Sequence, residues 1–191
     1  FSTLPGGRTI HALTERLDAS PYECVISMGG DGTFREVASA IYGSKRRELI
    51  AMGMLPTGTA NDQGRSFGLE AREGALERNV DVIAVGRETR LDAGLISTKS
   101  ADGSHAASAA FFDSAGWGLS ARVLATRNRD RKVVDGLGPL KELYRDHLVY
   151  AGALAREFLE SYVVPDKFRA RVVADGVAHT FEGLTDLVVK N

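Results

Sequence analysis

The first half of the chain alternates between short apolar runs and segments with helical spacing. Apolar runs at residues 24–26 and 49–54 predict buried strands at 23–27 and 49–54, and a glycine-containing turn follows each of them. Residues 9–18 and 34–42 carry apolar side chains at three- and four-residue spacing, which predicts helices. Because strand, helix and strand follow one another, the pattern predicts a parallel β-sheet covered by helices.

The neighbouring segments extend this pattern. Residues 1–3 have the composition of the end of an earlier strand, and residues 61–67 and 71–79 are expected to be helical. Apolar residues alternate with other residues at 80–85, which predicts a further strand.

Beyond residue 88 the pattern changes from alternating strands and helices to hairpins. Residues 101–104 have the composition of a hairpin turn, and Asp175-Gly176 is a strong two-residue hairpin signal. The expected strands lie at 90–98, 106–114, 168–174, 177–182 and 187–189, and a helical interval is expected at 140–162. Strands joined by such short turns are antiparallel.

This change predicts two domains. We expect an α/β domain with a parallel sheet at residues 1–88, followed at 89–191 by an antiparallel β-rich domain with a helical insertion. A cleft between two such domains is a common place for ligands to bind.

The composition limits the classes of function. With 43% apolar residues in 191, the chain has enough apolar side chains for a packed core. A net charge of −1 gives no reason to expect nucleic acid as a partner, since that binding depends on clustered Lys and Arg. Cys24 is the single cysteine, so no internal disulfide forms, and its place in an apolar run predicts a buried thiol.

Membrane association is expected to be peripheral. No apolar run approaches the ~20 residues that a transmembrane helix needs. We therefore expect a soluble, cytoplasmic protein that touches a membrane only at its surface. Strand edges in the second domain allow two copies to pair, so the sequence leaves a homodimer open.

Three glycines gather in the turn after residues 23–27. They are Gly29, Gly30 and Gly32, and Thr33 follows them. Glycine lets backbone N–H groups approach a ligand that a β-carbon would keep away, and the next helix adds the positive end of its dipole. The turn has the form of a phosphate-binding loop. The alternative is a tight strand-to-helix turn in which Thr33 caps the helix.

Two acidic residues accompany this turn. Asp31 would repel a bare phosphate, so its presence makes chemical sense if a divalent cation or a sugar hydroxyl comes with the phosphate. Glu36 follows on the first turn of the expected helix, where it can orient the loop or join a metal site. A glutamate there is also favourable through the helix dipole alone.

A second turn, Leu55-Pro56-Thr57-Gly58-Thr59-Ala60-Asn61-Asp62, follows the apolar run at 49–54. The carboxyl ends of neighbouring parallel strands meet at one edge of a sheet, where ligands bind. We therefore expect the two turns to lie side by side.

The two turns in this order, each after its own strand, resemble the catalytic domain of the diacylglycerol-kinase-like lipid kinases. Further along, residues 91–94 (Leu-Asp-Ala-Gly) and 111–118 (Phe-Phe-Asp-Ser-Ala-Gly-Trp-Gly) are similar to stretches of the same family. The resemblance implies an α/β nucleotide-binding domain followed by a β-rich lipid-binding domain. It also implies ATP as phosphoryl donor, Mg²⁺ as cofactor and a diacylglycerol-like lipid as acceptor.

The resemblance assigns roles to residues of both turns. The backbone of Gly29, Gly30 and Gly32 and the hydroxyl of Thr33 would hold the donor phosphates. Asp31 would act through Mg²⁺ or on the acceptor hydroxyl, and in the first case its carboxylate would be a ligand of Mg²⁺.

The second turn would complete the nucleotide site. Gly58 and Thr59 would close over the nucleotide, while Asn61 and Asp62 would cap the next helix or contact ribose or base. Thr3 stands where the family has a threonine at the nucleotide site, although it also fits an ordinary strand end.

The chain departs from the family pattern at several positions. Arg35 and Asp113 stand where Asn is usual, Ser120 stands where an Asp is common, and Gln63-Gly64 replaces Phe-Ala. The resemblance also implies a strand before Phe1 and a general base beyond Asn191, so we expect this chain to be incomplete at both ends.

Three functions remain open at this point. The first is an ATP-dependent lipid kinase. The second is an enzyme similar to the NAD kinases, which share the Gly-Gly-Asp-Gly-Thr turn. The residues of the second turn and the apolar stretch 111–118 favour a lipid as the substrate instead. The third is a catalytically silent module that binds nucleotide or lipid, which the departures at Arg35, Asp113 and Ser120 make credible.

Overall fold

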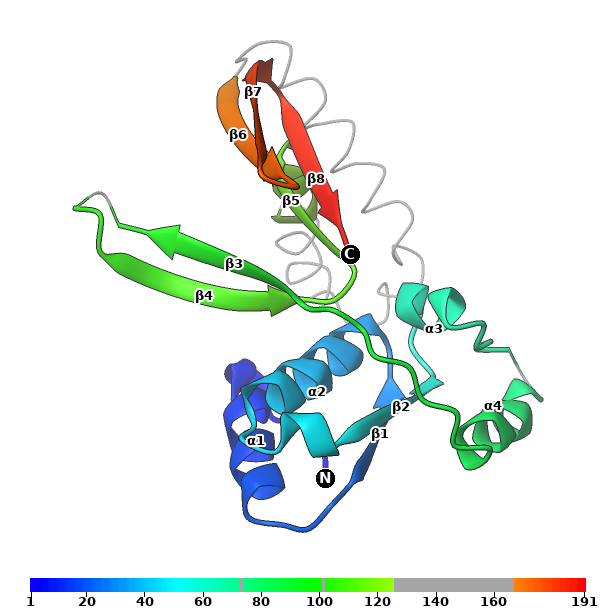
Figure 1. Cartoon of the computed structure of the whole chain (residues 1–191). Coiled ribbons are helices and arrows are strands. Elements are labelled where there is room, and N and C mark those ends of the chain that lie inside the picture. Colours follow the sequence, from blue (N-terminus) through cyan, green and yellow to red (C-terminus); the bar gives the residue numbers. More distant parts are fainter. Residues whose placement is uncertain (73, 101, 126–166) are drawn as a thin grey trace, which may run out of the picture. The chain divides into compact units, whose positions relative to one another are not determined.

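The computed structural model describes residues 1–72, 74–100, 102–125 and 167–191 (Figure 1). The chain divides into two compact units, residues 1–113 together with Asn191, and residues 114–190. The domain boundary expected after residue 88 stays a prediction.

The first unit contains the predicted parallel pair of strands. β1 (Cys24–Gly29) and β2 (Ala51–Pro56) pair in parallel, from Cys24 opposite Ala51 to Gly29 opposite Pro56. Helix α2 (Asp31–Gly43) connects them, and helix α1 (Thr9–Asp18) precedes β1 (Figure 1). The strand, helix and strand predicted from the apolar pattern are confirmed.

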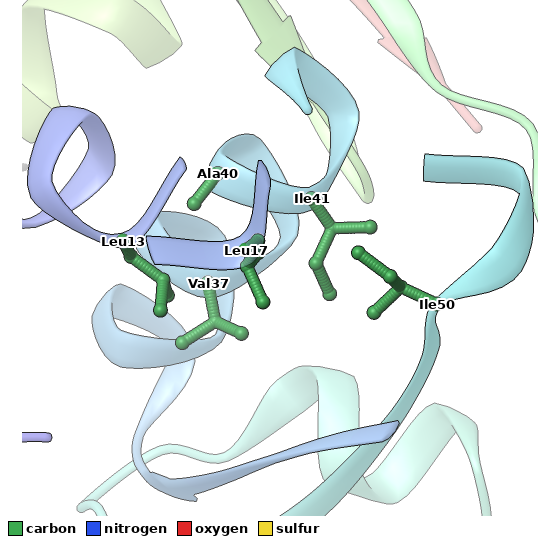
Figure 2. Close-up of a cluster of buried hydrophobic side chains, with 6 residues drawn as sticks. All are labelled: Leu13, Leu17, Val37, Ala40, Ile41 and Ile50. Carbon is green, nitrogen blue, oxygen red and sulfur yellow. The ribbon is translucent and has the colours of Figure 1, made fainter. Parts of the chain in front are cut away.

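The core of this unit forms where α1 and α2 pack together beside the start of β2 (Figure 2). Its buried members come from these elements and are Leu13, Leu17, Val37, Ala40, Ile41 and Ile50. Leu17 is 1% exposed, and burying a leucine side chain stabilises a fold by roughly 1.5–3 kcal/mol. The Thr14 hydroxyl donates to the Ala40 carbonyl at 3.0 Å, which fixes α1 against the carboxyl-terminal part of α2.

A polar connection joins the ends of these helices. One Asp18 carboxylate oxygen accepts hydrogen bonds from the Ser44 hydroxyl at 2.6 Å and the Lys45 amide at 2.9 Å. The Arg46 guanidinium donates to the carbonyl of Leu17 in the last turn of α1 and to that of Ser20 just beyond the helix. A short 3-10 helix, η2 (Arg47–Leu49), then leads into β2. These contacts hold the loop that follows α2 against α1.

The exposed face of β1 corrects one expectation. Cys24 is exposed, and so are Ile26 and Met28, while Ser27 is buried. Side chains alternate between the two faces of a strand, and the helices cover the face that Ser27 shares. The expectation of a buried Cys24 thiol is therefore wrong.

The strand expected at residues 1–3 is also absent. These residues pair with none of the described strands and lead into the 3-10 helix η1 (Pro5–Gly7). An extended segment becomes part of a sheet only if a neighbouring strand pairs with it. The composition of residues 1–3 alone was therefore not enough to predict their structure.

The strand predicted at residues 80–85 is wrong, because helix α4 (Ala75–Ala84) occupies most of it. Asn79 is buried on α4, and the Ile83 side chain packs over Gly53 of β2. An apolar alternation this short fits a strand and an amphipathic helix equally well, and packing against β2 decides for the helix. The short helix α3 (Asp62–Ser66) lies where a helix was expected.

The hairpins follow their predicted turns. In the first unit, β3 (Gly94–Lys99) and β4 (His105–Phe111) pair antiparallel. Asp102 accepts hydrogen bonds from the amide and the hydroxyl of Ser104 in the connecting turn. The antiparallel pairing expected for this part of the chain is confirmed.

In the second unit, β6 (Phe168–Ala174) and β7 (Val177–Leu184) form the hairpin predicted at Asp175-Gly176. Both turn residues have positive φ, 50° and 80°, as a type I′ turn requires. β5 (Ser114–Gly118) pairs antiparallel with β8 (Asp186–Lys190). The helical interval expected at 140–162 lies outside the described residues.

Within the described part of the chain, no helix combines the length and the apolar character that crossing a membrane requires.

Candidate functional site

The two glycine turns leave the same edge of the parallel sheet. Because Gly29 is opposite Pro56, both strands end at the same level. The Thr57 amide donates to the Gly29 carbonyl at 3.0 Å, so the pairing continues one residue beyond the end of β2. α2 begins directly after Gly30, whose carbonyl accepts from the Phe34 amide at 3.0 Å. The short strands and the helix start thus bring the turns together, as expected.

Gly30 and Gly58 lie backbone against backbone. A β-carbon on Gly58 would lie 2.9 Å from the Gly30 nitrogen, and one on Gly30 would lie 3.1 Å from the Gly58 Cα. Real β-carbons essentially never come within 3.0 Å of a backbone atom, so position 58 requires glycine, whereas a side chain at position 30 would require the Gly58 backbone to shift. The absence of side chains leaves two loops of backbone adjoining at the amino-terminal end of α2.

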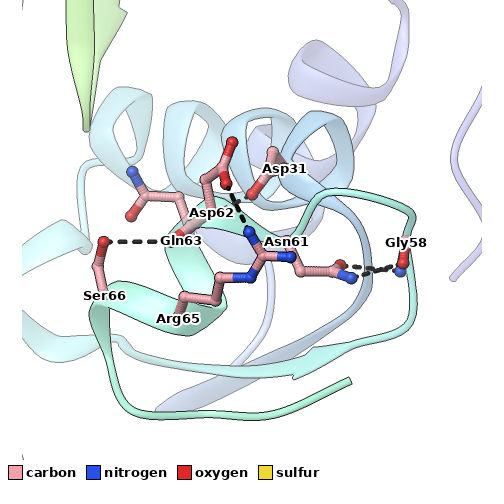
Figure 3. Close-up of polar contacts among 7 residues, drawn as sticks. All are labelled: Asp31, Gly58, Asn61, Asp62, Gln63, Arg65 and Ser66. Atoms are coloured by element: carbon pink, nitrogen blue, oxygen red, sulfur yellow. Dashed lines mark hydrogen bonds and ion pairs between the residues drawn. The ribbon is translucent and has the colours of Figure 1, made fainter. Parts of the chain in front are cut away.

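Asn61 locks the second turn from within. Its Oδ1 accepts from the Gly58 amide at 2.9 Å, and its Nδ2 donates to the Gly58 carbonyl (Figure 3). Asn61 is 3% exposed and has a φ of 53°, a left-handed conformation that Asn tolerates better than most residues. It occupies the N-cap position of α3, but its side chain makes no capping hydrogen bond there. Both polar groups of its side chain therefore serve the turn.

Asp31 connects the first turn to α3. Its Oδ1 accepts from the Gln63 amide at 3.0 Å, so a carboxylate on α2 satisfies an amide at the start of α3 (Figure 3). The buried Gln63 side chain donates from Nε2 to the Phe112 carbonyl at 3.3 Å. Asp62 is exposed and pairs with Arg65 on the next turn of the helix at 3.4 Å. Asp31 is thus held in place from outside its own helix.

The other glycines of the first turn differ in what surrounds them. A β-carbon on Gly29 would approach the Thr33 side chain closely, 2.7 Å from its Cβ. A β-carbon on Gly32 would meet no atom of the described residues within 4 Å. Packing within the protein therefore explains glycine at position 29, and it does not explain glycine at position 32.

The remaining candidates take no part in the contacts between the turns. Thr3 is exposed ahead of η1, Thr59 is exposed in the second turn, and Glu36 is partly buried on α2. In the second unit, the amide and hydroxyl of Ser120 donate to Asp186 at 3.0 and 2.7 Å. Among the described residues, no group of three or more His, Cys, Asp or Glu side chains is placed to hold a metal ion.

A small cavity adjoins the second turn. Its volume is about 220 Å³, and residues from the end of β2, the segment before α4 and α4 itself line it: Pro56, Thr57, Glu70, Ala71, Arg72, Leu76 and Asn79. Glu70 pairs here with Arg72 and with Arg78, the latter at 3.4 Å. The buried Asn79 side chain donates to the Glu70 carbonyl at 2.7 Å.

Sequence reasoning missed two parts of this arrangement. Gln63 was noted only as a departure from a family pattern, although its amide holds Asp31. The bonds between Asn61 and Gly58 were also not foreseen, although an Asn three residues after a turn glycine is a residue type that bonds to nearby backbone.

The comparison with known families agrees with this geometry. Residues 3–96 match the diacylglycerol kinase catalytic domain. This segment belongs to that family. The matched residues include both glycine turns, α2 and the connection through α4 to β3.

Curated relatives cover a similar part of the chain. "Probable lipid kinase YegS-like" of Enterobacter sp. is 39% identical over 77 residues, which are 40% of this chain and 25% of that protein. "Diacylglycerol kinase" of Staphylococcus epidermidis is 35% identical over 85 residues, 44% of this chain and 25% of that protein. "Probable lipid kinase YegS" of Escherichia coli is 39% identical over 93 residues, 41% of this chain and 31% of that protein. The matches thus span between a quarter and a third of the relatives' lengths.

Proposed function

We propose that this chain forms the nucleotide-binding part of a lipid kinase, which transfers the γ-phosphoryl group of ATP to a hydroxyl of a diacylglycerol-like lipid. The observation that carries the proposal is the contact between Gly30 and Gly58 at the edge of the parallel sheet. The family of residues 3–96 and the names of the relatives support the choice of a kinase that acts on lipids.

The adjoining turns suit a polyphosphate. Backbone N–H groups at a glycine turn that opens a helix are well placed to donate to phosphate oxygens, and the helix dipole favours negative charge there. Gly32 supports this assignment, since none of the described residues comes close enough to explain its missing side chain. In the proposal, Gly29, Gly30, Gly32 and Thr33 hold the donor phosphates, Gly58 and Thr59 cover them, and Thr3 lies at the nucleotide.

Acidic residues beside the turns suit a cation that comes with the nucleotide. Mg²⁺ is commonly bound by one or two carboxylates together with substrate phosphates, so it needs no cluster made by the protein alone. We assign Asp31 to this role, with Asp62 at the start of α3 and Glu36 further along α2 as additional acidic residues. When bound, Mg²⁺ would neutralise charge on the phosphates. The Gln63 amide, by holding one oxygen of Asp31, would fix the direction of its carboxylate.

The asparagine of the second turn takes a supporting role. The hydrogen bonds of Asn61 with Gly58 make it the residue that keeps the turn closed against Gly30. We therefore assign it to holding the backbone of the nucleotide site rather than to contacting ribose or base.

The proposed lipid substrate determines where in the cell the protein would work. A lipid acceptor lies in a bilayer, and we propose that the protein works in the cytoplasm and meets the membrane at its surface. We also propose that the β-rich residues beyond 88 contribute to binding the lipid, and that paired strand edges allow a homodimer.

An assay with radiolabelled ATP tests the function and its alternatives. The product of the whole reading frame is incubated with diacylglycerol, sphingosine or NAD. We expect label in the chloroform-soluble product with diacylglycerol and none after Asp31→Ala. Label in NADP would establish the NAD-kinase alternative instead, and nucleotide binding without any labelled product would establish a silent module.

A further inference from the structure

We propose that Arg35 binds the polyphosphate of the donor nucleotide and balances the negative charge of Asp31. This inference rests on the proposed function and names a residue of this chain that departs from the family pattern. It makes position 35 a determinant of how strongly the nucleotide is held.

The position of Arg35 on α2 brings it near the glycine turns. α2 begins at Asp31, so Arg35 is four residues further on and lies above Asp31 on the same face of the helix. Side chains on a helix tilt toward its amino-terminal end, which here is the end where Gly30 meets Gly58. An arginine side chain is long enough to extend from this position toward the first turn.

Arg35 does not form the ion pair that its spacing favours. An Asp four residues before an Arg normally pairs with it on a helix surface. Here the Asp31 carboxylate accepts from the Gln63 amide, and no ion pair or hydrogen bond joins Arg35 to any residue in the described part of the chain. The Arg35 side chain is exposed, so its guanidinium is available to a ligand.

The acidic residues around the two glycine turns favour a positively charged group beside them. Asp31, Glu36 and Asp62 are negative, and Arg65 is already paired with Asp62 at 3.4 Å. A nucleoside triphosphate adds further negative charge. A guanidinium matches phosphate oxygens with two parallel hydrogen bonds, which a neutral Asn at the same position does not provide.

The ordinary explanation for an exposed arginine is that it only interacts with water. The two explanations differ in what removal of the charge does to ligands of different phosphate content. A solvated Arg35 affects no ligand, whereas a phosphate-binding Arg35 affects ATP more than AMP. Arg16 offers a matched control because it is an exposed arginine near the end of α1, which packs by Thr14 against Ala40 in the carboxyl-terminal part of α2.

The test is equilibrium binding of MgATP and of AMP to the 191-residue chain and to Arg35→Gln, Arg35→Lys and Arg16→Gln. We expect Arg35→Gln to weaken ATP binding roughly 10- to 100-fold, the loss of a charge-assisted contact, and to leave AMP binding unchanged. Arg35→Lys should fall between Arg35→Gln and the unchanged chain, because it keeps the charge and loses the paired hydrogen bonds. Arg16→Gln should bind both nucleotides normally.

Three results would overturn the inference. They are unchanged ATP binding by Arg35→Gln, an equal loss of ATP and AMP, and an equal loss in Arg16→Gln. A thermal unfolding midpoint that stays unchanged in Arg35→Gln assigns any loss to binding rather than to folding. If the unchanged chain binds no ATP at all, the proposed function fails as well. If the unchanged chain and Arg35→Gln bind ATP equally well, the inference fails and the proposed function stands.

Discussion

The Gly58 backbone lies so close to Gly30 that a β-carbon on Gly58 would come within 2.9 Å of the Gly30 nitrogen and 3.0 Å of the Asn61 Oδ1. Two loops that are separate in sequence thus form one continuous backbone surface at the edge of the sheet. The account of the site depends on this contact.

Replacing Gly58 with Ala should push the turns apart. We expect Gly58→Ala to lower the free energy of unfolding by about 1–3 kcal/mol, as forced overpacking does, and to weaken ATP binding. Urea unfolding and nucleotide titration measure the two effects. An alanine variant as stable as the unchanged chain would contradict the close approach.

Gly32 allows folding and binding to be separated. In the part of the chain that the structure describes, no neighbouring atom lies within 4 Å of a β-carbon placed there, and Ala is favoured over Gly inside a helix. We expect Gly32→Ala to be as stable as the unchanged chain, or more stable by up to roughly 1 kcal/mol, and yet to bind ATP more weakly because its methyl group would occupy space left for phosphate. Normal ATP binding in this variant would remove Gly32 from the site.

Loss of the Asn61 side chain should open the second turn. Asn61→Ala leaves the Gly58 amide and carbonyl without their partner and places Ala at a φ of 53°. We expect it to reduce the free energy of unfolding by about 1–3 kcal/mol. Asn61→Asp keeps an oxygen that accepts from the Gly58 amide but loses the donor, so its loss should be smaller. Hydrogen exchange at the Gly58 amide follows the opening directly, and equal exchange in all three proteins would contradict the lock.

The Asp18 carboxylate should make stability depend on pH in acid. Hydrogen bonds from the Ser44 hydroxyl and the Lys45 amide, with the positive charges of Lys45 and Arg46 nearby, lower the pKa of Asp18 below its ordinary value of 3.8. A lowered pKa in the folded state means that the stabilisation is present above the unfolded-state pKa and is lost as the pH falls through the folded-state pKa. Urea midpoints measured from neutral to acidic pH should therefore fall more steeply below about pH 4 in the unchanged chain than in Asp18→Asn. Parallel curves would show that this carboxylate does not contribute.

Local signals predicted most of the elements correctly. The glycines between β1 and α2 predicted a strand-to-helix turn, and Asp175-Gly176 predicted the hairpin of β6 and β7. These residue types adopt backbone conformations that other residues avoid. The order of strand, helix and strand was enough to place both turns at one edge of a parallel sheet, since parallel strands end together.

The errors occurred where contacts with residues distant in sequence determine the secondary structure or the burial of a segment. Residues 80–85 became helical because Ile83 packs over Gly53, and Cys24 shares the face of β1 on which Ile26 and Met28 are also exposed. The hydrogen bond between Asp31 and the Gln63 amide spans the segment from α2 to α3 and leaves no periodic signal. A local sequence pattern specifies a turn. Residues that lie near the turn in space determine which of its side chains are buried or hydrogen-bonded.

The most direct test of the central claim is a titration of the isotope-labelled chain with MgATP, followed by the amide resonances of both turns. The account predicts saturable shifts at Gly30, Gly32, Thr33 and Gly58, and much smaller ones at residues around Thr14 and Ala40 near the other end of α2. Saturable binding that leaves the turn amides unshifted, or the absence of any shift with ATP, would contradict it.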